Sequence, residues 1–222
     1  MPAEATADSY AWITHEAYAG MLISGLSVIF VRDRDHASLL GALGLPMPVD
    51  EAGMLTPAGL SVASVYTHPA GSIMVERTGY VGALRAVMES LSTGAVAASV
   101  TRTFETDMLF AYAENGEVIS AFNVDEPASR RGRSPDAIAA HIADLGFPTF
   151  DYDLEDEDER EDEDEDIYAA EHGKRLLALC CALALATRLT GLRLTEEQLA
   201  APLPQYSISS LYSAGGVAAR FV

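Results

Sequence analysis

The chain has 222 residues, of which 49% are hydrophobic, enough to build a buried core and too many for a chain disordered throughout. Its 33 acidic and 14 basic residues give a net charge of -19, which argues against direct binding to nucleic acid or to an anionic membrane surface, because both need clustered Lys and Arg. The longest apolar run, residues 176–186, is about half of the ~20 residues that span a membrane, and no signal-peptide pattern opens the chain, so we expect a cytoplasmic protein.

The first predicted elements are a strand followed by a short helix. Residues 1–9 are small and polar, and we predict them to be disordered. The apolar run 26–31 is typical of a strand. A helix is predicted over 36–43, after Asp33 or Asp35, either of which suits the N-cap position. The fold therefore begins with a strand and a helix in succession.

The middle of the chain predicts a hairpin, a helix and two further strands. Strands over residues 61–66 and 73–76 flank a turn of His, Pro, Ala and Gly, which indicates a hairpin. Apolar residues over 78–93 recur at the i, i+3, i+4 spacing of a helix. Residues 95–103 and 108–113 have the composition of strands.

The last predicted elements are a second hairpin and three helices. The Asn-Gly pair at 115–116 favours a type I′ turn, because both residues tolerate positive φ, and it leads into a strand over 118–122. Helices are predicted over 134–145, where Pro follows a Ser, and over 169–190, which is apolar nearly all round. A capping-box pattern at 195–198 begins a final short helix.

These elements predict an α+β fold, with a mainly antiparallel sheet of about five to six strands, helices on one face of the sheet and a C-terminal helical segment. Side chains on the apolar phase of each element are expected in the core, namely Val28, Phe30, Leu84, Val87, Val100, Phe110, Tyr112, Leu177 and Leu183. The predicted parts are a disordered N-terminus (1–9), an α+β sheet domain (10–150), an acidic linker (151–167), C-terminal helices packed on the same domain (168–203) and a tail (204–222).

Most of the charge lies in one segment, residues 151–166, where thirteen acids and one Arg give a local charge of -12. The other 206 residues carry 20 acids and 13 bases, a balance of -7, so the rest of the chain is only mildly acidic. Two interpretations stay open, a solvated, self-repelling linker or a docking tract for a basic partner. In the second case the partner-binding residues are Glu155, Asp156, Glu157, Asp158, Glu159, Glu161, Asp162, Glu163, Asp164, Glu165 and Asp166.

The sequence contains no motif that names a catalytic residue, a metal or a cofactor. The five histidines lack the spacing of a metal site, the acidic tract has no Gly of a calcium loop, and neither a GxSxG elbow nor a phosphate-binding glycine motif occurs. Cys180 and Cys181 are adjacent in an apolar helix and are expected to be buried and unbridged. The basic cluster at 130–133 is expected to pair with the acidic tract.

Four segments carry turns, caps and core positions that belong together: Tyr10-Ala11-Trp12, Ser27-Val28-Ile29-Phe30-Val31-Arg32 with the helix ending at Leu43-Gly44, Phe110-Ala111-Tyr112-Ala113-Glu114-Asn115-Gly116-Glu117, and Ala186-Thr187-Arg188-Leu189-Thr190-Gly191-Leu192-Arg193-Leu194-Thr195. Together they resemble an uncharacterised family of actinobacterial cytoplasmic proteins, a domain of unknown function. The resemblance spans most of residues 10–203. It implies an α+β fold and carries no activity and no catalytic residues.

The charge and the lack of catalytic motifs favour a non-enzymatic protein–protein interaction module, immunity-like or regulatory, with an acidic surface for a basic partner. The rival interpretation is a small enzyme whose pocket is formed by residues distant in sequence. A pocket with two or more convergent ionisable groups of shifted pKa would favour the enzyme, whereas a sheet face without a pocket would favour the interaction module. The sequence leaves the oligomeric state open.

Overall fold

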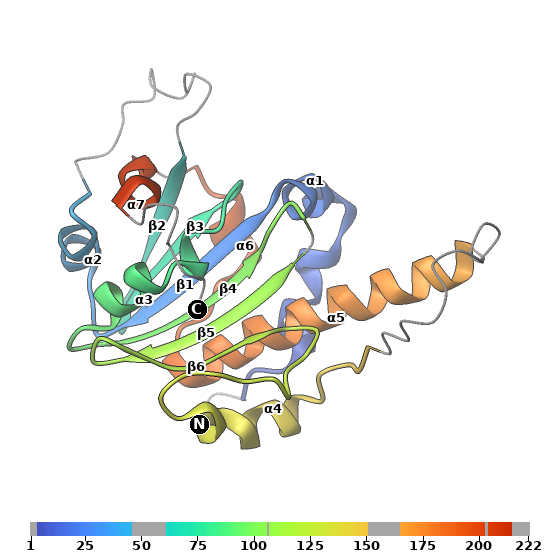
Figure 1. Cartoon of the computed structure of the whole chain (residues 1–222). Helices are drawn as coiled ribbons and strands as arrows, with labels where there is room; N and C mark the ends of the chain where they lie inside the picture. Colours follow the sequence, from blue (N-terminus) through green and yellow to red (C-terminus); the bar gives the residue numbers. More distant parts are fainter. Residues whose placement is uncertain (1–3, 46–60, 106, 151–164, 203, 215–222) are drawn as a thin grey trace.

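One antiparallel sheet of seven strands lies at the centre of the described chain, in the order β6-β5-β4-β1-β3-β2-β7 (Figure 1). The computed structural model describes residues 4–45, 61–105, 107–150, 165–202 and 204–214. The α+β class and the antiparallel sheet are confirmed, and the strand count exceeds the five to six expected. The strands are β1 (Leu26–Arg32), β2 (Val62–His68), β3 (Gly71–Glu76), β4 (Val96–Arg102), β5 (Met108–Glu114), β6 (Glu117–Asn123) and β7 (Gln205–Ser207).

Helices cover both faces of this sheet (Figure 1). The α-helices are α1 (Glu16–Ser24), α2 (His36–Leu43), α3 (Arg85–Ser92), α4 (Ala139–Leu145), α5 (Glu165–Thr190), α6 (Glu196–Ala200) and α7 (Ser209–Ala214). The 3₁₀ helices of the described residues are η1 (Ala7–Thr14), η3 (Val81–Ala83) and η4 (Pro135–Ile138).

The central strand β1 is apolar on both faces of the sheet, so one layer of helices could cover only half of its buried side chains. Its first six residues are all buried, between β3 on one side and β4 on the other. Val28 and Phe30 pack in a core that includes η1, α4 and α5, whereas Ile29 and Val31 pack in a second core that includes α2 and α3. The prediction of helices on one face is therefore wrong. A strand with a continuous apolar run is typical of a sheet that is covered on both faces.

The predicted core residues are buried in the structure, with one exception. Leu177 is 46% exposed, so its assignment to the core is wrong, because α5 reaches full cover only from residue 178 onward. Cys180 and Cys181 are buried and unbridged, as predicted. The buried members of the predicted set are Val28, Phe30, Leu84, Val87, Val100, Phe110, Tyr112 and Leu183.

The turn and cap residues predicted from short patterns take the expected geometry. Asn115 and Gly116 have φ of 51° and 85° and join β5 to β6. Asp35 caps α2, its side chain accepting a hydrogen bond from the Ser38 backbone N–H at 2.8 Å. The capping box is formed at α6, which begins directly after Thr195. These local signals are confirmed.

The helix predicted over 78–93 is divided into η3 and the shorter α3. The break falls at Leu84, whose backbone is extended with ψ of 115°. The backbone N–H groups of Val81 and Gly82 donate instead to side chains of the sheet, those of Glu76 and Ser27. The apolar positions keep their helical spacing, but polar side chains beneath them hold η3 in place.

The segments predicted as a disordered N-terminus, 1–9, and a tail, 204–222, both contain regular structure in their described residues. The helix η1 begins at Ala7, inside the segment predicted to be disordered, and the Ala5 carbonyl accepts a hydrogen bond from Arg188 Nε at 2.7 Å. Within the predicted tail, β7 pairs with β2 at the sheet edge and α7 follows. A three-residue strand with one buried side chain, Tyr206, has no periodicity that a sequence could reveal.

Candidate protein-docking surface

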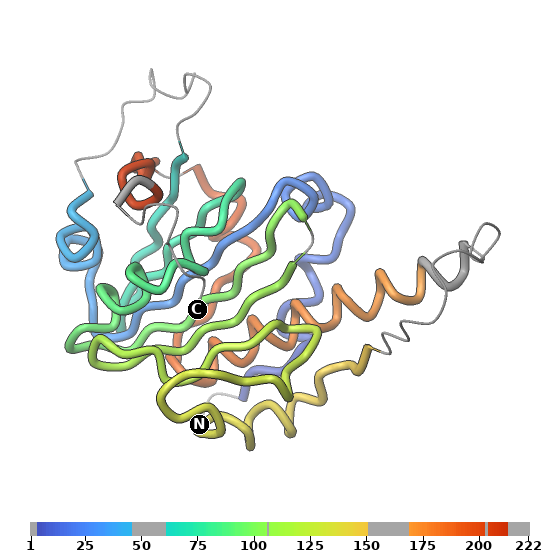
Figure 2. The backbone as a smooth tube through the Cα atoms, viewed as in Figure 1, coloured from blue at the N-terminus to red at the C-terminus, as the bar shows by residue number. Residues whose placement is uncertain are grey.

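The helix α5 is built in two parts. Its 26 residues make it about 39 Å long at 1.5 Å per residue. Residues 178–186 are buried on all sides of the helix, whereas residues 169–174 are all exposed. Figures 1 and 2 show the N-terminal part of α5 extending beyond the sheet. The C-terminal half therefore anchors α5 in the core, and the other half projects from it.

A groove of about 300 Å³ lies between η1 and the part of α5 that leaves the core. The α5 residues that line it are spaced i, i+3, i+4 and i+7, which places them on one face of the helix. A Cβ built on Gly173 would meet no atom within 4 Å, so the groove is open at that position. The lining residues are Ala7, Asp8, Ala11 and Thr14 from η1 and Gly173, Leu176, Leu177 and Cys180 from α5.

The η1 wall of the groove is fixed by hydrogen bonds to the C-terminal part of the chain. The Tyr10 hydroxyl lies 2.6 Å from Thr187 Oγ1 and accepts a hydrogen bond from the Leu194 backbone N–H at 3.3 Å. Arg193 donates to the Ser9 carbonyl at 3.2 Å. Because Tyr10 is fully buried, its burial raises the pKa of the phenol, and it remains a neutral anchor.

The groove has the chemistry of a binding surface for apolar side chains. Leu176 and Leu177 supply apolar surface, and Asp8 is an exposed acid of the lining. Cys180 donates its thiol hydrogen to the Tyr10 carbonyl at 3.5 Å, and burial raises the pKa of Cys180 to about 12. A protonated thiol is a poor nucleophile at neutral pH, so Cys180 contributes packing to the groove.

Most of the predicted partner-binding acids lie outside the described residues. These are Glu155, Asp156, Glu157, Asp158, Glu159, Glu161, Asp162, Glu163 and Asp164. Glu165 and Asp166 begin α5, so the helix starts inside the segment predicted as a linker, 151–167. Acidic residues in the first turn are favourable there, because the N-terminus of a helix carries partial positive charge.

The basic cluster has partners within the folded part of the chain. Arg130 forms an ion pair with Asp136 at 2.7 Å, and Arg133 pairs with Glu117. The backbone of Arg131 pairs with that of Ala121. The predicted pairing with the acidic tract concerns acids outside the described residues and stays a prediction.

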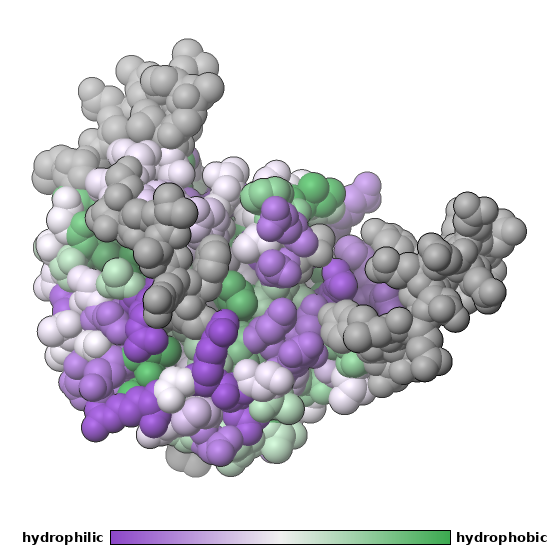
Figure 3. Space-filling view, in the orientation of Figure 1, coloured by the Kyte–Doolittle hydropathy of each residue, from purple (hydrophilic) through white to green (hydrophobic). Residues whose placement is uncertain are grey.

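Three large apolar side chains are exposed in the described part of the chain: Ile23 on α1, Phe104 between β4 and β5, and Leu177 on α5. Figure 3 shows hydrophobic atoms near α1 within a face that is largely hydrophilic. Isolated exposed apolar side chains are common on protein surfaces. Leu177 differs from the other two because it lines the groove.

A buried polar centre beneath η3 is the structure's other unusual feature. Glu76, Ser27 and Thr101 stand opposite one another on β3, β1 and β4 and are all buried. Both carboxylate oxygens of Glu76 lie within 2.6 Å of the Tyr212 hydroxyl, and one accepts the Val81 backbone N–H at 3.0 Å. Burial raises the pKa of Glu76, and the bonds from Tyr212 and Val81 oppose that rise.

This polar centre is filled by the protein itself. A Cβ on Gly79 would come within 2.2 Å of a Glu76 carboxylate oxygen, and one on Gly82 within 2.6 Å of Ser27 Oγ. Ser27 Oγ also lies 3.0 Å from Thr101 Oγ1. The centre therefore ties η3 and α7 to the sheet, with side-chain atoms close against Gly79 and Gly82. The sequence does not reveal this centre. Alternation along β3 indicates on which face of the sheet Glu76 lies, but it does not indicate that Ser27, Val81 and Tyr212 lie near it.

The described ranges contain neither a cluster of metal ligands nor a membrane-spanning helix. No group of three or more His, Cys, Asp or Glu side chains is placed to hold a metal ion in those ranges. None of the described helices is long and apolar enough to cross a membrane.

Comparison with known proteins identifies the family. The model of a family of unknown function, DUF6461, matches residues 58–209, more than half of the chain, and the chain belongs to that family. The match includes the β5–β6 hairpin and all of α5, but not η1 or β1. No curated protein and no solved structure matches the chain.

Proposed function

We propose that this DUF6461 protein is a non-enzymatic interaction module that binds a basic partner protein along α5. The acids at 155–166 attract the partner, and the groove between η1 and α5 accepts its apolar side chains. The observation that carries the proposal is the projecting half of α5, because the acidic tract enters that helix at its exposed end.

The pairing of the basic side chains supports this proposal. Arg188 bonds Asp144 at 2.6 Å and lies 3.6 Å from Glu4. Arg85 pairs with Glu89 at 2.8 Å, one helical turn away. These arginines already have acidic partners near them in the fold. A partner protein is therefore a suitable source of the positive charge that the tract of -12 attracts.

The shape of the groove favours an amphipathic helix as the partner's binding element. Helices that dock in grooves use apolar anchors at i, i+3, i+4 and i+7, and the α5 wall has that spacing itself. Basic residues on the other face of such a helix would lie toward Asp8 and the acidic tract. Apolar contacts then determine how long the complex lasts, and charge determines how fast it forms.

The rival interpretation, a small enzyme, finds less support in the described groove. Of its lining residues, Asp8 carries a carboxylate and Cys180 a thiol, and burial raises the pKa of that thiol to about 12. A thiol that stays protonated is a poor nucleophile, so the lining offers little for catalysis by a nucleophile and a base.

The proposed role is immunity-like or regulatory, and its setting is the cytoplasm. Support for the setting comes from Cys180 and Cys181, which are free thiols buried in the core. Free buried thiols are usual in reducing compartments. Support for the role comes from a surface that combines charge with an apolar groove rather than from any shared activity.

The experiment that tests the proposal is capture of partners from native lysate by the full chain, at 0.1 M and 1 M salt. Two variants are compared with the native protein: one with Asp→Asn and Glu→Gln throughout 155–166, and Leu177→Glu in the groove. We expect a basic protein that the native chain retains at 0.1 M salt, with at least tenfold less recovered by the neutralised variant or at 1 M salt.

The matched control is Ile23→Ser, which changes an exposed apolar residue outside the groove lining. This variant should retain the same protein as the native chain. Leu177→Glu should recover less of it at both salt concentrations. Equal recovery by the native and neutralised proteins, or recovery of acidic proteins alone, overturns the proposal.

A further inference from the structure

The turn between β5 and β6 places an exposed asparagine directly before a glycine. Asn115 and Gly116 form this turn with φ of 51° and 85°, and Asn115 is exposed. The chain has one other asparagine, Asn123, and the residue after it is the branched and fully buried Val124. Asn115 is therefore the asparagine whose side-chain amide lies next to an unhindered backbone nitrogen.

An asparagine followed by glycine can lose its side-chain amide without an enzyme. The Gly116 nitrogen attacks the side-chain carbonyl carbon of Asn115, and the new C–N bond closes a succinimide ring. The side-chain nitrogen leaves as ammonia, which takes up the proton of the Gly116 amide. Water then opens the ring at either of its carbonyl carbons, and the product is aspartate or isoaspartate. Glycine favours the ring closure because it has no Cβ beside the attacking nitrogen.

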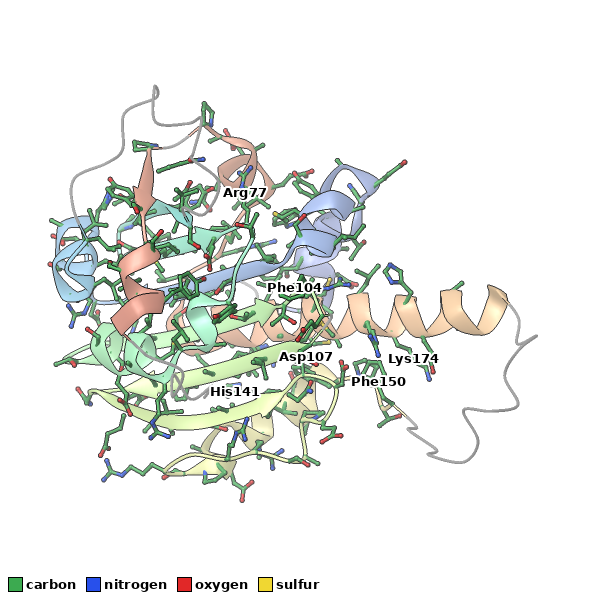
Figure 4. The ribbon with its side chains drawn as sticks, turned by 45° about the horizontal axis from the view of Figure 1, so that its top comes forward. Arg77, Phe104, Asp107, His141, Phe150 and Lys174 are labelled. Atoms are coloured by element: carbon green, nitrogen blue, oxygen red, sulfur yellow. The ribbon has the colours of Figure 1, made fainter. Side chains whose placement is uncertain are left out.

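The fold binds both backbone N–H groups of this turn to the end of α3 and the residues that follow it. The Asn115 N–H donates to the Ala95 carbonyl at 3.2 Å. The Gly116 N–H donates to Ser92 Oγ at 3.1 Å. Figures 1 and 4 show α3 lying over the end of the sheet at which β5 turns into β6. The nitrogen that would attack Asn115 is therefore already bound in the folded protein.

Ser92 is a fixed acceptor for that N–H group. It is fully buried, and its own hydroxyl donates to the Glu89 carbonyl at 3.3 Å within α3. A Cβ on Gly116 would lie 3.3 Å from Thr93 Oγ1, so the turn packs closely against the end of the helix. An amide nitrogen is a weak nucleophile, because its lone pair is delocalised into the carbonyl group. Attack therefore requires Gly116 to lose its proton and its peptide plane to turn, and both steps break the bond to Ser92.

We propose that Asn115 is a site of spontaneous deamidation and that Ser92 slows the reaction by holding the Gly116 N–H. The product places a new carboxylate between Glu114 and Glu117. Isoaspartate also adds a main-chain carbon to a turn whose geometry suits two ordinary residues. Deamidation therefore adds like charge to the hairpin and alters the turn that joins β5 to β6. This inference does not depend on the proposed protein partner.

The test is incubation of the full chain at pH 8, followed by peptide mass spectrometry that separates asparagine, aspartate and isoaspartate at position 115. Deamidation of the folded native protein should be at least ~10-fold slower than that of the same chain unfolded in urea, because the folded turn must open first. Ser92→Ala should deamidate about three- to tenfold faster than the native protein while still folded, which is the range expected for the loss of one hydrogen bond.

The matched control is Ser90→Ala, which removes a hydroxyl from the same helix that donates to the Ala42 carbonyl at 2.7 Å. This variant should deamidate at the native rate, and Asn123 should stay unmodified in every folded sample. The comparison of folded and unfolded native protein decides the question even if Ser92→Ala does not fold. Equal rates in the folded and unfolded native chain, a native rate in folded Ser92→Ala, or an equal acceleration in Ser90→Ala overturns the proposal.

Discussion

The carboxylate of Glu76 is buried in the sheet and accepts hydrogen bonds from two other elements of the fold. Val81 donates from η3, and Tyr212 donates from α7 near the C-terminus. No Lys or Arg of the described residues forms an ion pair with Glu76. The Tyr212 hydroxyl therefore joins α7 to the buried acid, beside the hydrogen bond from the Ser61 backbone N–H to Ser209 Oγ and the packing of Leu211 on the core.

Replacing Tyr212 by Phe should make stability more sensitive to pH. Burial raises the pKa of Glu76 above its ordinary value of 4.5, so its contribution to stability is full below pH 4.5 and declines as the pH rises through the folded pKa. Removing the hydroxyl raises that pKa further. Denaturant unfolding should show a loss of ~1–3 kcal/mol at pH 8 and a smaller loss at pH 5.

Tyr18→Phe is the control for this experiment. The Tyr18 hydroxyl also donates to a carboxylate, that of Glu196 at 3.2 Å, but this pair is exposed. Its removal should change stability by less than ~0.5 kcal/mol at either pH. If Tyr212→Phe costs the same at pH 5 and pH 8, Glu76 does not change its charge in that range.

A second prediction concerns Phe110, which lies in the core between the sheet and α5. Phe110 is fully buried and stacks on Phe122, directly opposite on β6, with ring centroids 5.1 Å apart. Phe110→Ala should cost ~3–5 kcal/mol in denaturant unfolding, because it removes a large buried ring and leaves a cavity. The exposed Phe104 offers the control, with less than ~0.5 kcal/mol expected for Phe104→Ala. A loss below ~1 kcal/mol for Phe110→Ala would contradict the assigned packing.

At the scale of elements, the two parts of α5 differ in burial, since residues 178–186 are buried and residues 169–174 are exposed. The buried half holds the helix, so the first turns can unwind without disturbing the core. Deleting residues 155–164 should therefore leave the melting temperature within about 3 °C of the native value, since so many like charges cannot be buried without cations. Thermal melts of the deletion and of the charge-neutralised variant provide the comparison. A loss of cooperative unfolding on deletion alone would show that the tract packs on the fold.

The elements that the sequence predicts well are those set by neighbouring residues. Asn115-Gly116 defines its own turn, and Asp35 caps α2 through a bond three residues away. The second helical layer was missed although the apolar run of β1 contained the signal, because a continuous run is typical of burial on both faces. The groove could not be predicted from neighbouring residues. Leu177 belongs to an apolar run, yet it is exposed because the buried part of α5 begins at residue 178.

On the scale of the whole molecule, charge and apolar surface are arranged along one helix. The tract at 151–166 carries -12 of the total charge of -19 and leads into α5. The groove begins where that helix meets η1. A partner attracted by the tract would therefore meet the groove next, which separates the step that brings the proteins together from the step that holds them.

This separation predicts how the tract should affect binding kinetics. Attraction between exposed charges is strong when the Debye length is ~10 Å at 0.1 M salt and nearly vanishes at ~3 Å in 1 M salt. Changing Asp to Asn and Glu to Gln across 155–166 should slow association with a captured partner severalfold or more at 0.1 M salt, while dissociation changes little. Surface plasmon resonance at both salt concentrations measures the two rates.

Leu177→Glu should show the opposite pattern, with faster dissociation, because it alters the groove and not the tract. If the neutralised and native proteins associate equally fast at 0.1 M salt, the tract is a solvated spacer and the partner is recognised without it.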